Sequence, residues 1–340
     1  MAQVDVIVPL YNKAATIERA IDSIQRQSLT DWRAIVVNDG STDESPALVQ
    51  RLGDERITLI HQKNQGPGAA RNTGLRHATA PFVAFLDADD EYYRDHLANA
   101  LAALGESDVP LVAAMYIEWP KATDMTAVWA RRGIRPGRYE LQHDTPAQLA
   151  ENLCFFFHVG NSLLRREIAL AYDGFYDQHR CSYGEDSTFF IRILMNHPCR
   201  ILAPLALCHH REDSSLSHNF EHPVPPFLED PDVLLRYCPD HIRDLMQRVI
   251  ARMALRTAHH WARNGQGKIA ADLLQRFPRT RDWPAYRFRC RLEVALSPIL
   301  PYWVRIKRTV GPPTRSAANR LARKLRLLPP LPATRENRPS

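Results

Sequence analysis

Apolar and polar residues follow two distinct patterns along the first part of the chain. Continuous apolar runs predict four buried strands, at residues 4–10, 32–39, 57–62 and 82–87. Between the first two runs, Ile17, Ile21 and Ile24 recur at the spacing of one helix face. Because strands and helices alternate, we predict an α/β fold with a mostly parallel sheet flanked by helices.

The pattern loosens after a further strand predicted at residues 111–119. Residues 120–145 are rich in Gly, Pro and Arg, and a helix at 187–197 and a strand at 200–210 follow them. The proline-rich stretch HNFEHPVPPFLEDP then indicates a boundary, and helices are predicted beyond it, over 231–277.

These patterns divide the chain into three predicted parts. The first is a domain at residues 1–220, with halves at 1–119 and 120–220. A helical extension at 221–300 and a basic tail at 301–340 follow it.

The net charge of +6 comes from the tail. Residues 303–340 hold ten Lys and Arg and one acid, a charge of +9, whereas the preceding 302 residues hold 34 Lys and Arg and 37 acids, a charge of −3. We therefore expect no nucleic-acid-binding body.

The tail also has an amphipathic pattern. Leu321, Leu325 and Leu328 fall at helical spacing among basic residues, and Tyr302 and Trp303 lie upstream of them. These features favour adsorption to an anionic membrane surface. A solvated or disordered end has comparable weight, because Pro and Arg dominate the last dozen residues.

The cysteines and the first residues of the chain favour a cytoplasmic location. The six cysteines form no C-x-x-C pair and no regular spacing, which favours reduced thiols over a disulfide framework. The first residues predict a strand, not a signal peptide, and no apolar run is long enough to span a bilayer. We expect a cytoplasmic protein, peripheral at the inner face of the cell membrane if the tail binds there.

Four acids in five positions follow the apolar run at residues 82–87. Asp87, Asp89, Asp90 and Glu91 repel one another, by on the order of 3 kcal/mol for each close pair at an effective dielectric of about 20. An Asp-x-Asp at the carboxyl end of a parallel strand suits a hard cation such as Mn²⁺ or Mg²⁺. Taken alone, an acidic turn that caps the next helix is an equally good interpretation.

Four sequence blocks, taken together, favour the metal site. VDVIVPLYN, VVNDGSTD, GPGAARNTGL and FLDADD occur in this order over residues 3–93. Their order and spacing resemble the family 2 nucleotide-sugar glycosyltransferases with the A-type fold. The resemblance continues more weakly through GNSLLRRE, YGEDSTFFIRI and HHREDSSLS, and so covers about the first 220 residues.

The resemblance implies roles for particular residues on the donor side. Residues 1–119 would bind the donor nucleotide sugar, with contacts from Pro9, Leu10, Tyr11, Asp39, Arg71, Asp87, Ala88 and Asp89. Asp89 and Asp87 would hold the metal ion, and His210 is a further candidate ligand. From the residues alone, Asp39 could also cap the next helix, a role compatible with the first, and Arg71 could merely pair with Asp39 or Asp87.

Residues 120–220 would bind the acceptor and supply the catalytic base. By resemblance Asp186 is that base, and Asn161, Gly174, Phe175 and Glu185 lie on the acceptor side. The alternative for Asp186 is an N-cap of the helix that follows it.

The sequence therefore predicts a metal-dependent inverting glycosyltransferase. Its donor would be a nucleotide sugar, with UDP-sugars favoured, and its acceptor a saccharide or a lipid-linked sugar in surface-polysaccharide assembly. A nucleotidyltransferase is the alternative enzyme, although it would be expected to carry a glycine-rich, lysine-bearing loop where this chain has PLYNKAAT. A non-catalytic nucleotide-sugar-binding protein would keep Asp89 but would not need Asp186.

Overall fold

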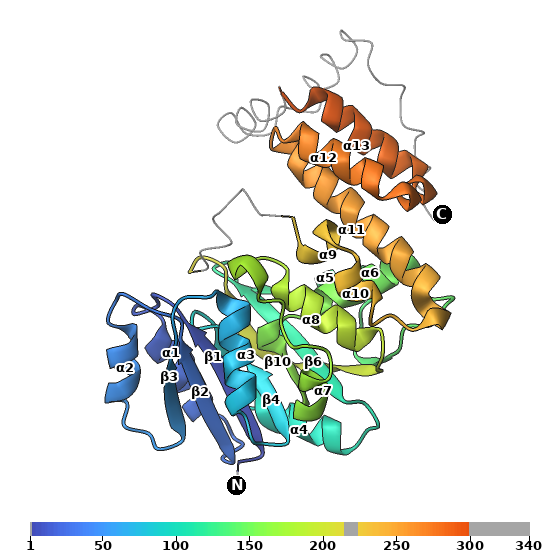
Figure 1. Ribbon diagram of the computed structural model, residues 1–340. Coiled ribbons are helices and arrows are strands. Elements are labelled where there is room, and N and C mark those ends of the chain that lie inside the picture. The colour runs from blue at the N-terminus through green and yellow to red at the C-terminus, as the bar shows by residue number, and fades with distance from the viewer. Residues whose placement is uncertain (1, 214–223, 299–340) are drawn as a thin grey trace, which may run out of the picture.

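The parallel part of the sheet is built from the first four strands (Figure 1). The structure is a computed structural model that describes residues 2–213 and 224–298. Neighbouring strands run in the order β3-β2-β1-β4 and all pair in parallel. These strands are β1 (Val4–Leu10), β2 (Trp32–Asn38), β3 (Ile57–His61) and β4 (Phe82–Phe85). The predicted alternation is confirmed, because α1 (Ile17–Gln25), α2 (Ser45–Arg51) and α3 (Pro67–His77) connect them.

The same sheet becomes mixed in its second half. It continues from β4 in the order β9-β6-β10-β5, and β9 is antiparallel to both of its neighbours. These strands are β9 (Ser162–Arg165), β6 (Leu111–Trp119), β10 (Cys199–His210) and β5 (Glu91–Tyr92). The short strands β7 (Thr123–Asp124) and β8 (Gly137–Tyr139) pair with β6 and β10. The α/β class is confirmed, with the purely parallel arrangement confined to β1–β4.

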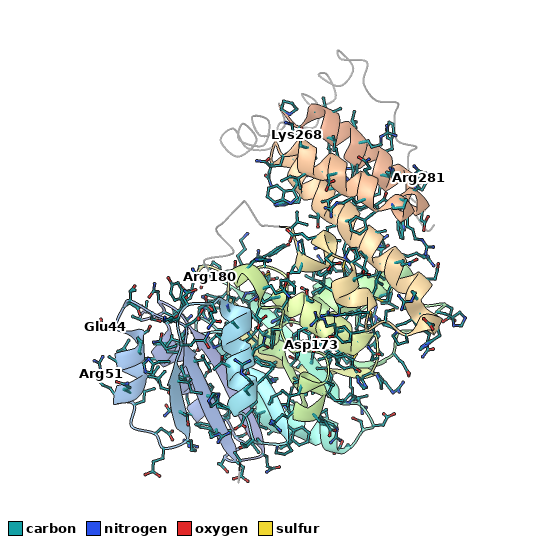
Figure 2. The ribbon with its side chains drawn as sticks, viewed as in Figure 1. Glu44, Arg51, Asp173, Arg180, Lys268 and Arg281 are labelled. Atoms are coloured by element: carbon teal, nitrogen blue, oxygen red, sulfur yellow. The ribbon has the colours of Figure 1, made fainter. Side chains whose placement is uncertain are left out.

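Helices cover both faces of this second half. They are α4 (His96–Gly105), α5 (Thr126–Arg131), α6 (Ala147–Phe156), α7 (Arg166–Leu170) and α8 (Glu185–Leu194). Short 3-10 helices occur at Val159–Asn161, Gln178–Arg180, Asp240–Ile242 and Pro278–Asp282. Charged side chains such as Glu44, Arg51 and Lys268 lie on the outside of the molecule (Figure 2).

The sheet and α3 pack closely through a glycine. A Cβ built on Gly74 of α3 would lie 2.3 Å from Cγ2 of Ile7, a fully buried residue of β1. Only a residue without a side chain lets the helix approach the strand this closely. Further along, Phe85, Phe175 and Phe189 pack ring against ring and join β4 to α8 through the core.

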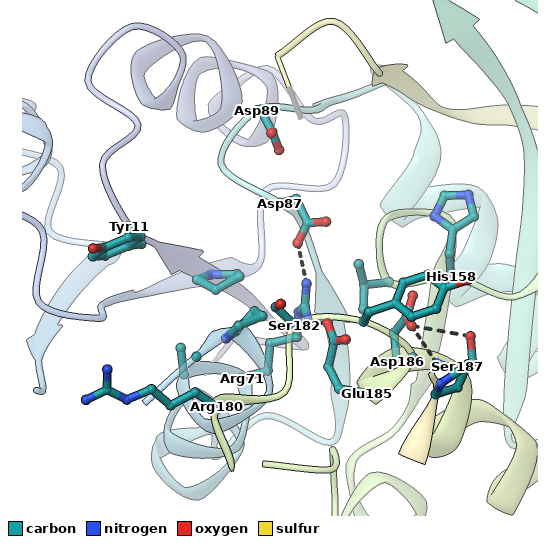
Figure 3. A pocket seen from close by; sticks show the side chains of 18 of the residues that line it. Tyr11, Arg71, Asp87, Asp89, His158, Arg180, Ser182, Glu185, Asp186 and Ser187 are labelled. Carbon is teal, nitrogen blue, oxygen red and sulfur yellow. Dashed lines mark hydrogen bonds and ion pairs between the residues drawn. The ribbon is translucent and has the colours of Figure 1, made fainter. Parts of the chain in front are cut away.

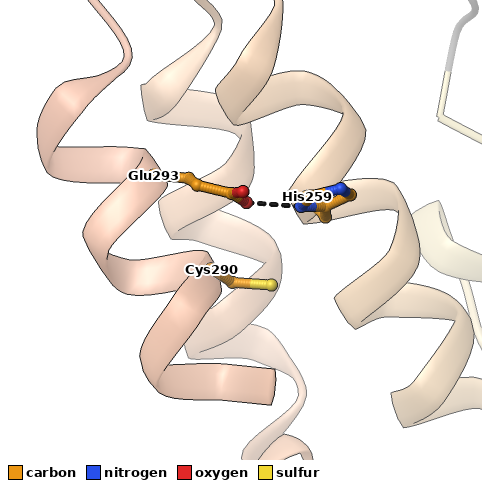
Figure 4. A group of neighbouring side chains, drawn as sticks. All are labelled: His259, Cys290 and Glu293. Atoms are coloured by element: carbon orange, nitrogen blue, oxygen red, sulfur yellow. Dashed lines mark hydrogen bonds and ion pairs between the residues drawn. The ribbon is translucent and has the colours of Figure 1, made fainter. Parts of the chain in front are cut away.

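A helical region follows the sheet and rises above it (Figure 1). It contains α9 (Pro226–Glu229), α10 (Asp232–Leu235), α11 (Arg243–Arg263), α12 (Gly267–Arg276) and α13 (Pro284–Leu296). The long helix α11 packs against α6, where Arg252 Nε lies 2.8 Å from Glu151 Oε2. Further along α11, His259 contacts Glu293 of α13, and Cys290 lies beside this pair (Figure 4). The predicted helical extension is thus present.

Two predictions fall partly or wholly outside the described residues. The predicted boundary at residue 220 lies in the gap at 214–223, so the division into domains stays a prediction. The basic tail, with Tyr302, Trp303 and its leucines, lies beyond residue 298. Among the residues that are described, no helix is both long and apolar enough to cross a membrane.

Candidate active site

The predicted donor residues meet in one cavity of about 940 Å³. It lies at the carboxyl ends of β1, β2 and β4, where ligands bind in sheets of this type. Its wall includes all of the residues predicted for the donor: Pro9, Leu10, Tyr11, Asp39, Arg71, Asp87, Ala88 and Asp89. Asp186 and Glu185 of α8 also line it, so residues far apart in the sequence face the same space (Figure 3).

Tyr11 and Asp39 lie at the end of the cavity formed by the first strands. Tyr11 is 48% exposed, so its ring is free to stack on a flat ligand. The Asp39 carboxylate is buried and accepts hydrogen bonds from Gln62 Nε2 at 2.8 Å and from the backbone N–H groups of Gln65 and Gly66 at 2.9 and 2.8 Å. Asp39 therefore holds the loop that leads into α3.

The second role predicted for Asp39, as a cap of the next helix, is wrong. That helix, α2, begins at Ser45, six positions later, and the residue that accepts from the Ser45 N–H is Asp43. Tight packing of the loop before α3 explains the difference, because it draws Asp39 toward Gly66 instead.

Arg71 links the two acidic motifs. Its Nη2 lies 2.6 Å from Asp87 Oδ1, and its Nη1 lies 2.9 Å from Glu185 Oε1 (Figure 3). Burial alone would raise the pKa of Asp87, but the Arg71 guanidinium outweighs it and holds that pKa below its usual value. Burial and the neighbouring Asp186 raise the pKa of Glu185 to about 7, against the opposing effect of Arg71.

Asp87, Asp89 and Asp90 form the acid cluster that the sequence predicted. Each offers a carboxylate oxygen, and these atoms lie within 4.8 Å of one another. Burial and the charge of Asp87 raise the pKa of Asp89, while Lys13, whose Nζ lies 2.6 Å from Asp89 Oδ2, opposes the shift. Lys13 and Arg71 offset part of the mutual repulsion, and carboxylate oxygens this close together fit a hard divalent cation such as Mn²⁺ or Mg²⁺.

His210 touches this cluster through its backbone N–H, which donates to Asp90 Oδ1 at 2.8 Å, but its ring is directed elsewhere, which corrects the prediction that the ring could be a metal ligand beside Asp89. Its Nε2 lies 2.8 Å from Glu91 Oε1 and its Nδ1 lies 3.2 Å from Glu212 Oε1, so both ring nitrogens already face acids. The neighbouring His209 lines the cavity instead. Successive side chains of a strand point to opposite faces, and β10 presents His209 to the cavity.

Asp186 lies in the first turn of α8 and faces the cavity. The helix begins at Glu185 with Gly184 as its N-cap residue, so the predicted alternative of Asp186 as the N-cap is wrong by two positions. Asp186 Oδ1 accepts a hydrogen bond from the Ser187 N–H at 2.6 Å. Burial raises the pKa of Asp186, against the opposing charge of Arg71. A carboxylate whose pKa is raised in this way is suited to accept a proton near neutral pH.

Three of the predicted acceptor-side residues do not reach the cavity. Asn161 is fully buried, and its Nδ2 donates to the carbonyl oxygens of Ala114 and Phe156. Phe175 is a core residue stacked on Phe189, with ring centroids 4.2 Å apart. Gly174 adopts a φ of 63° and packs against Asn72. These positions are structural in this fold, and of the predicted acceptor residues only Glu185 lines the cavity.

One wall of the cavity, which the sequence did not predict, comes from the helical extension. Five residues of α11 contribute to it: Met253, Arg256, Thr257, His260 and Trp261. Their positions follow the i, i+3, i+4, i+7, i+8 spacing of one helix face. This face mixes apolar, basic and aromatic residues, so its periodicity does not stand out as a core stripe.

The sheet, the acid cluster at its strand ends and the facing acid of α8 define an A-type glycosyltransferase fold, as the sequence predicted. Residues 5–172 match the family model described as Glycosyl transferase family 2. Over these residues the chain is similar to that family.

Proteins similar in sequence are glycosyltransferases and a polysaccharide biosynthesis protein. The uncharacterized glycosyltransferase EpsJ of Bacillus subtilis is 30% identical over 190 residues, which is 55% of this chain and 54% of that protein. The succinoglycan biosynthesis protein ExoW of Rhizobium meliloti is 44% identical over 115 residues, which is 32% of this chain and 36% of that protein. This chain therefore spans about half or less of the length of these relatives.

A solved structure shares the fold over nearly the whole chain. The crystal structure of S. aureus TarS 1-349 in complex with UDP-GlcNAc superposes with a TM-score of 0.69 and 18% sequence identity. The match covers 90% of this chain and 92% of that one, so it extends into the helical region. The similarity confirms the predicted fold.

Proposed function

We propose that the protein is a metal-dependent, inverting glycosyltransferase of the hexosyltransferase type. Its donor would be a nucleoside-diphosphate sugar, and its acceptor a hydroxyl of a saccharide or of a lipid-linked sugar in surface-polysaccharide assembly. The observation that carries the proposal is the shared cavity, in which Asp186 faces the same space as the donor residues Tyr11, Asp87 and Asp89. The complex of TarS with UDP-GlcNAc makes that UDP-sugar the first donor to test.

The donor side would be held by the chain's own charges and rings. Tyr11 is exposed to stack on a base, and Asp39 already fixes the loop that borders the same end of the cavity. Asp89 and Asp87 would hold Mn²⁺ or Mg²⁺, which when bound would stabilise the charge on the diphosphate leaving group. Arg71 keeps Asp87 ionised and orients it.

Asp186 would act as the catalytic base. Its carboxylate would accept the proton of the acceptor hydroxyl as that oxygen bonds to the anomeric carbon and the bond to the diphosphate breaks. A positioned base of this kind contributes about 10²–10⁴-fold in rate. Displacement by a single attack inverts the anomeric centre. Glu185 would keep the first turn of α8 in place through its ion pair with Arg71.

A screen of nucleotide sugars tests the proposal. The purified protein is incubated with each donor, a panel of saccharide acceptors, and Mn²⁺ or Mg²⁺, and the release of nucleoside diphosphate is measured. We expect release with at least one donor, dependent on the cation and faster with an acceptor present. Tight donor binding without release, across the whole panel, would favour a non-catalytic nucleotide-sugar-binding protein instead.

The cellular setting is also part of the proposal. A cytoplasmic enzyme held at the inner face of the cell membrane would meet lipid-linked acceptors directly. The +9 charge of residues 303–340 supports attraction to anionic lipids.

A further inference from the structure

One end of the cavity is built by α11, which supplies none of the residues predicted for the donor. The donor residues come from the carboxyl ends of β1, β2 and β4 and from α3, whereas α11 packs against α6 and α9. Figure 1 shows α11 above α6 and α8, away from β1–β3. Asp186, on the first turn of α8, borders the same cavity. If the donor lies along the strand ends, an acceptor that presents its hydroxyl to Asp186 has the α11 end left to occupy.

Two arginines one helical turn apart on α11 differ sharply in their surroundings. Arg252 is mostly buried and forms the ion pair with Glu151, so it serves to join α11 to α6. Arg256 lines the cavity and is exposed. Within residues 2–213 and 224–298, no acid forms an ion pair with Arg256.

The Arg256 guanidinium is nevertheless held in place. Its central carbon lies 4.4 Å from the centroid of the Phe155 ring, which also lines the cavity. Stacking on an aromatic face restricts a guanidinium without consuming its hydrogen-bond donors. A pre-positioned guanidinium with its donors facing a cavity is well suited to bind a phosphate group in a bidentate manner.

Aromatic and apolar side chains also line this end, beside Thr257 and His260 of α11. Phe227 of α9, Tyr183 and Trp261 line it together with Met253. Such surfaces contact the flat faces of sugar rings or a hydrocarbon chain, and a few polar groups among them set the orientation of a ligand. This end is therefore suited to a ligand that carries an anionic group for Arg256 next to an apolar chain or a sugar ring.

We propose that the α11 end of the cavity is the acceptor subsite, and that Arg256 binds a phosphate group carried by the acceptor. This inference rests on the proposed glycosyltransferase function and specifies its acceptor as phosphorylated. The phosphate could belong to the diphosphate of a lipid-linked sugar or to a phosphorylated saccharide, since both present the same oxygens to the guanidinium. Arg256 is then a specificity-determining residue, and Phe155 positions it.

Calorimetric titrations of the full-length protein test this assignment. The donor side is first saturated with UDP and Mg²⁺. Geranyl diphosphate and glucose 6-phosphate are then titrated as probes of the two phosphate sources, with geraniol and glucose as their uncharged counterparts. We expect at least one phosphorylated probe to bind the UDP-loaded protein more tightly than its uncharged counterpart, and the probe that binds identifies the source.

Variants of α11 assign that binding to Arg256. R256A should lower the affinity for the phosphorylated probe by roughly tenfold or more. R256K should lower this affinity less, because a lysine keeps the charge but loses the bidentate geometry. R263A is the matched control, since Arg263 is an exposed arginine of the same helix outside the cavity wall, and it should bind like the unmodified protein. Circular dichroism of each variant confirms that α11 remains folded.

Three results would overturn the inference: no binding of either phosphorylated probe, equal binding by R256A and R263A, or displacement of the probe by UDP. The last result would assign Arg256 to the donor diphosphate. The titration of UDP itself is a separate measurement of the proposed function. If UDP fails to bind, the function proposal fails, while the probe titration without UDP still decides whether Arg256 binds phosphate.

Discussion

Arg71 Nη1 lies 2.9 Å from Glu185 Oε1, and this buried ion pair joins α3 to the first turn of α8. Through its other terminal nitrogen, the same guanidinium contacts Asp87. The residue after Glu185 is Asp186, so a donor-side acid and the proposed base are held by a single cation.

The Glu185 carboxyl should give the stability of the protein a distinct pH dependence. Its pKa of about 7 in the folded protein exceeds the ordinary value of 4.5, so the folded state holds this proton more tightly than the unfolded state. The stabilisation is complete below about pH 4.5 and is lost as the pH rises toward 7, with a slope of up to about 1.4 kcal/mol per pH unit. E185Q should abolish this pH dependence. The free energy of unfolding in urea, measured at pH 5, 6 and 7 for both proteins, tests this. A parallel pH dependence in both proteins would contradict the assignment.

Asp186→Asn should abolish transfer while preserving the donor site. We expect a loss of about 10²-fold or more in turnover, because an amide cannot accept the proton. The amide oxygen can still accept the hydrogen bond from the Ser187 N–H, so UDP affinity and thermal stability should change little. In the unmodified protein, the raised pKa of Asp186 should move the acidic limb of the pH–rate profile of the proposed transfer above that of an ordinary aspartate. Transfer within a few-fold of normal would leave Asp186 without a catalytic role.

Asp89→Asn should remove the cation dependence of nucleotide binding. The substitution keeps the shape of the side chain but removes one of the charges in the cluster. Calorimetry with UDP, with and without Mn²⁺, should show that Mn²⁺ no longer strengthens binding. D144N is the control, because Asp144 is exposed and lies outside the cavity wall. If Mn²⁺ strengthens binding equally in D89N and D144N, the cation lies elsewhere.

Gly74→Ala should destabilise the sheet by about 1–3 kcal/mol, as expected for overpacking in a tight core. The added methyl group would meet Ile7 at 2.3 Å, and Ile7 is fully buried in β1. Gly105→Ala is the matched control, because nothing lies within 4 Å of a Cβ at that helix end. Thermal unfolding followed by circular dichroism compares the two variants. Equal melting temperatures would mean that α3 can move away from β1 at little cost.

Removing residues 303–340 should release the protein from anionic vesicles. Each Lys or Arg near such a surface contributes about 1 kcal/mol, and salt weakens the attraction. Sedimentation with phosphatidylglycerol vesicles at low and high salt measures the effect. Diphosphate release with a short soluble acceptor should stay near normal, since the cavity-wall residues within the described part of the chain all precede residue 262. Equal sedimentation of the full-length and shortened proteins would contradict the prediction that the tail binds the membrane.

The first half of the sheet could be predicted from the sequence because each strand there is a continuous apolar run followed by a helix. The insertion of β9 between β4 and β6 could not. β9 has only four residues, Ser162–Arg165, and its antiparallel pairing is set by tertiary packing. Local periodicity carries no information about which distant strand a short segment joins.

The sequence could predict that the end of β10 borders the site, but not that His209 rather than His210 would face the cavity. Side chains alternate along a strand, but β10 has register shifts between Leu202 and Leu205 and between Leu205 and Leu207. Each irregularity alters which face the following residues occupy. The donor residues avoid this problem, because they follow directly from the ends of regular strands.

The position of α11 has a consequence for how enzymes of this design could diversify. The match to the family model ends at residue 172, whereas α11, which lines the far end of the cavity, begins at Arg243. Changes on that helix face can accumulate without disturbing β1–β4, where the donor residues lie. With the acceptor subsite as proposed, exchanging the helical extension between relatives should therefore change the acceptor preference and leave the donor preference unchanged.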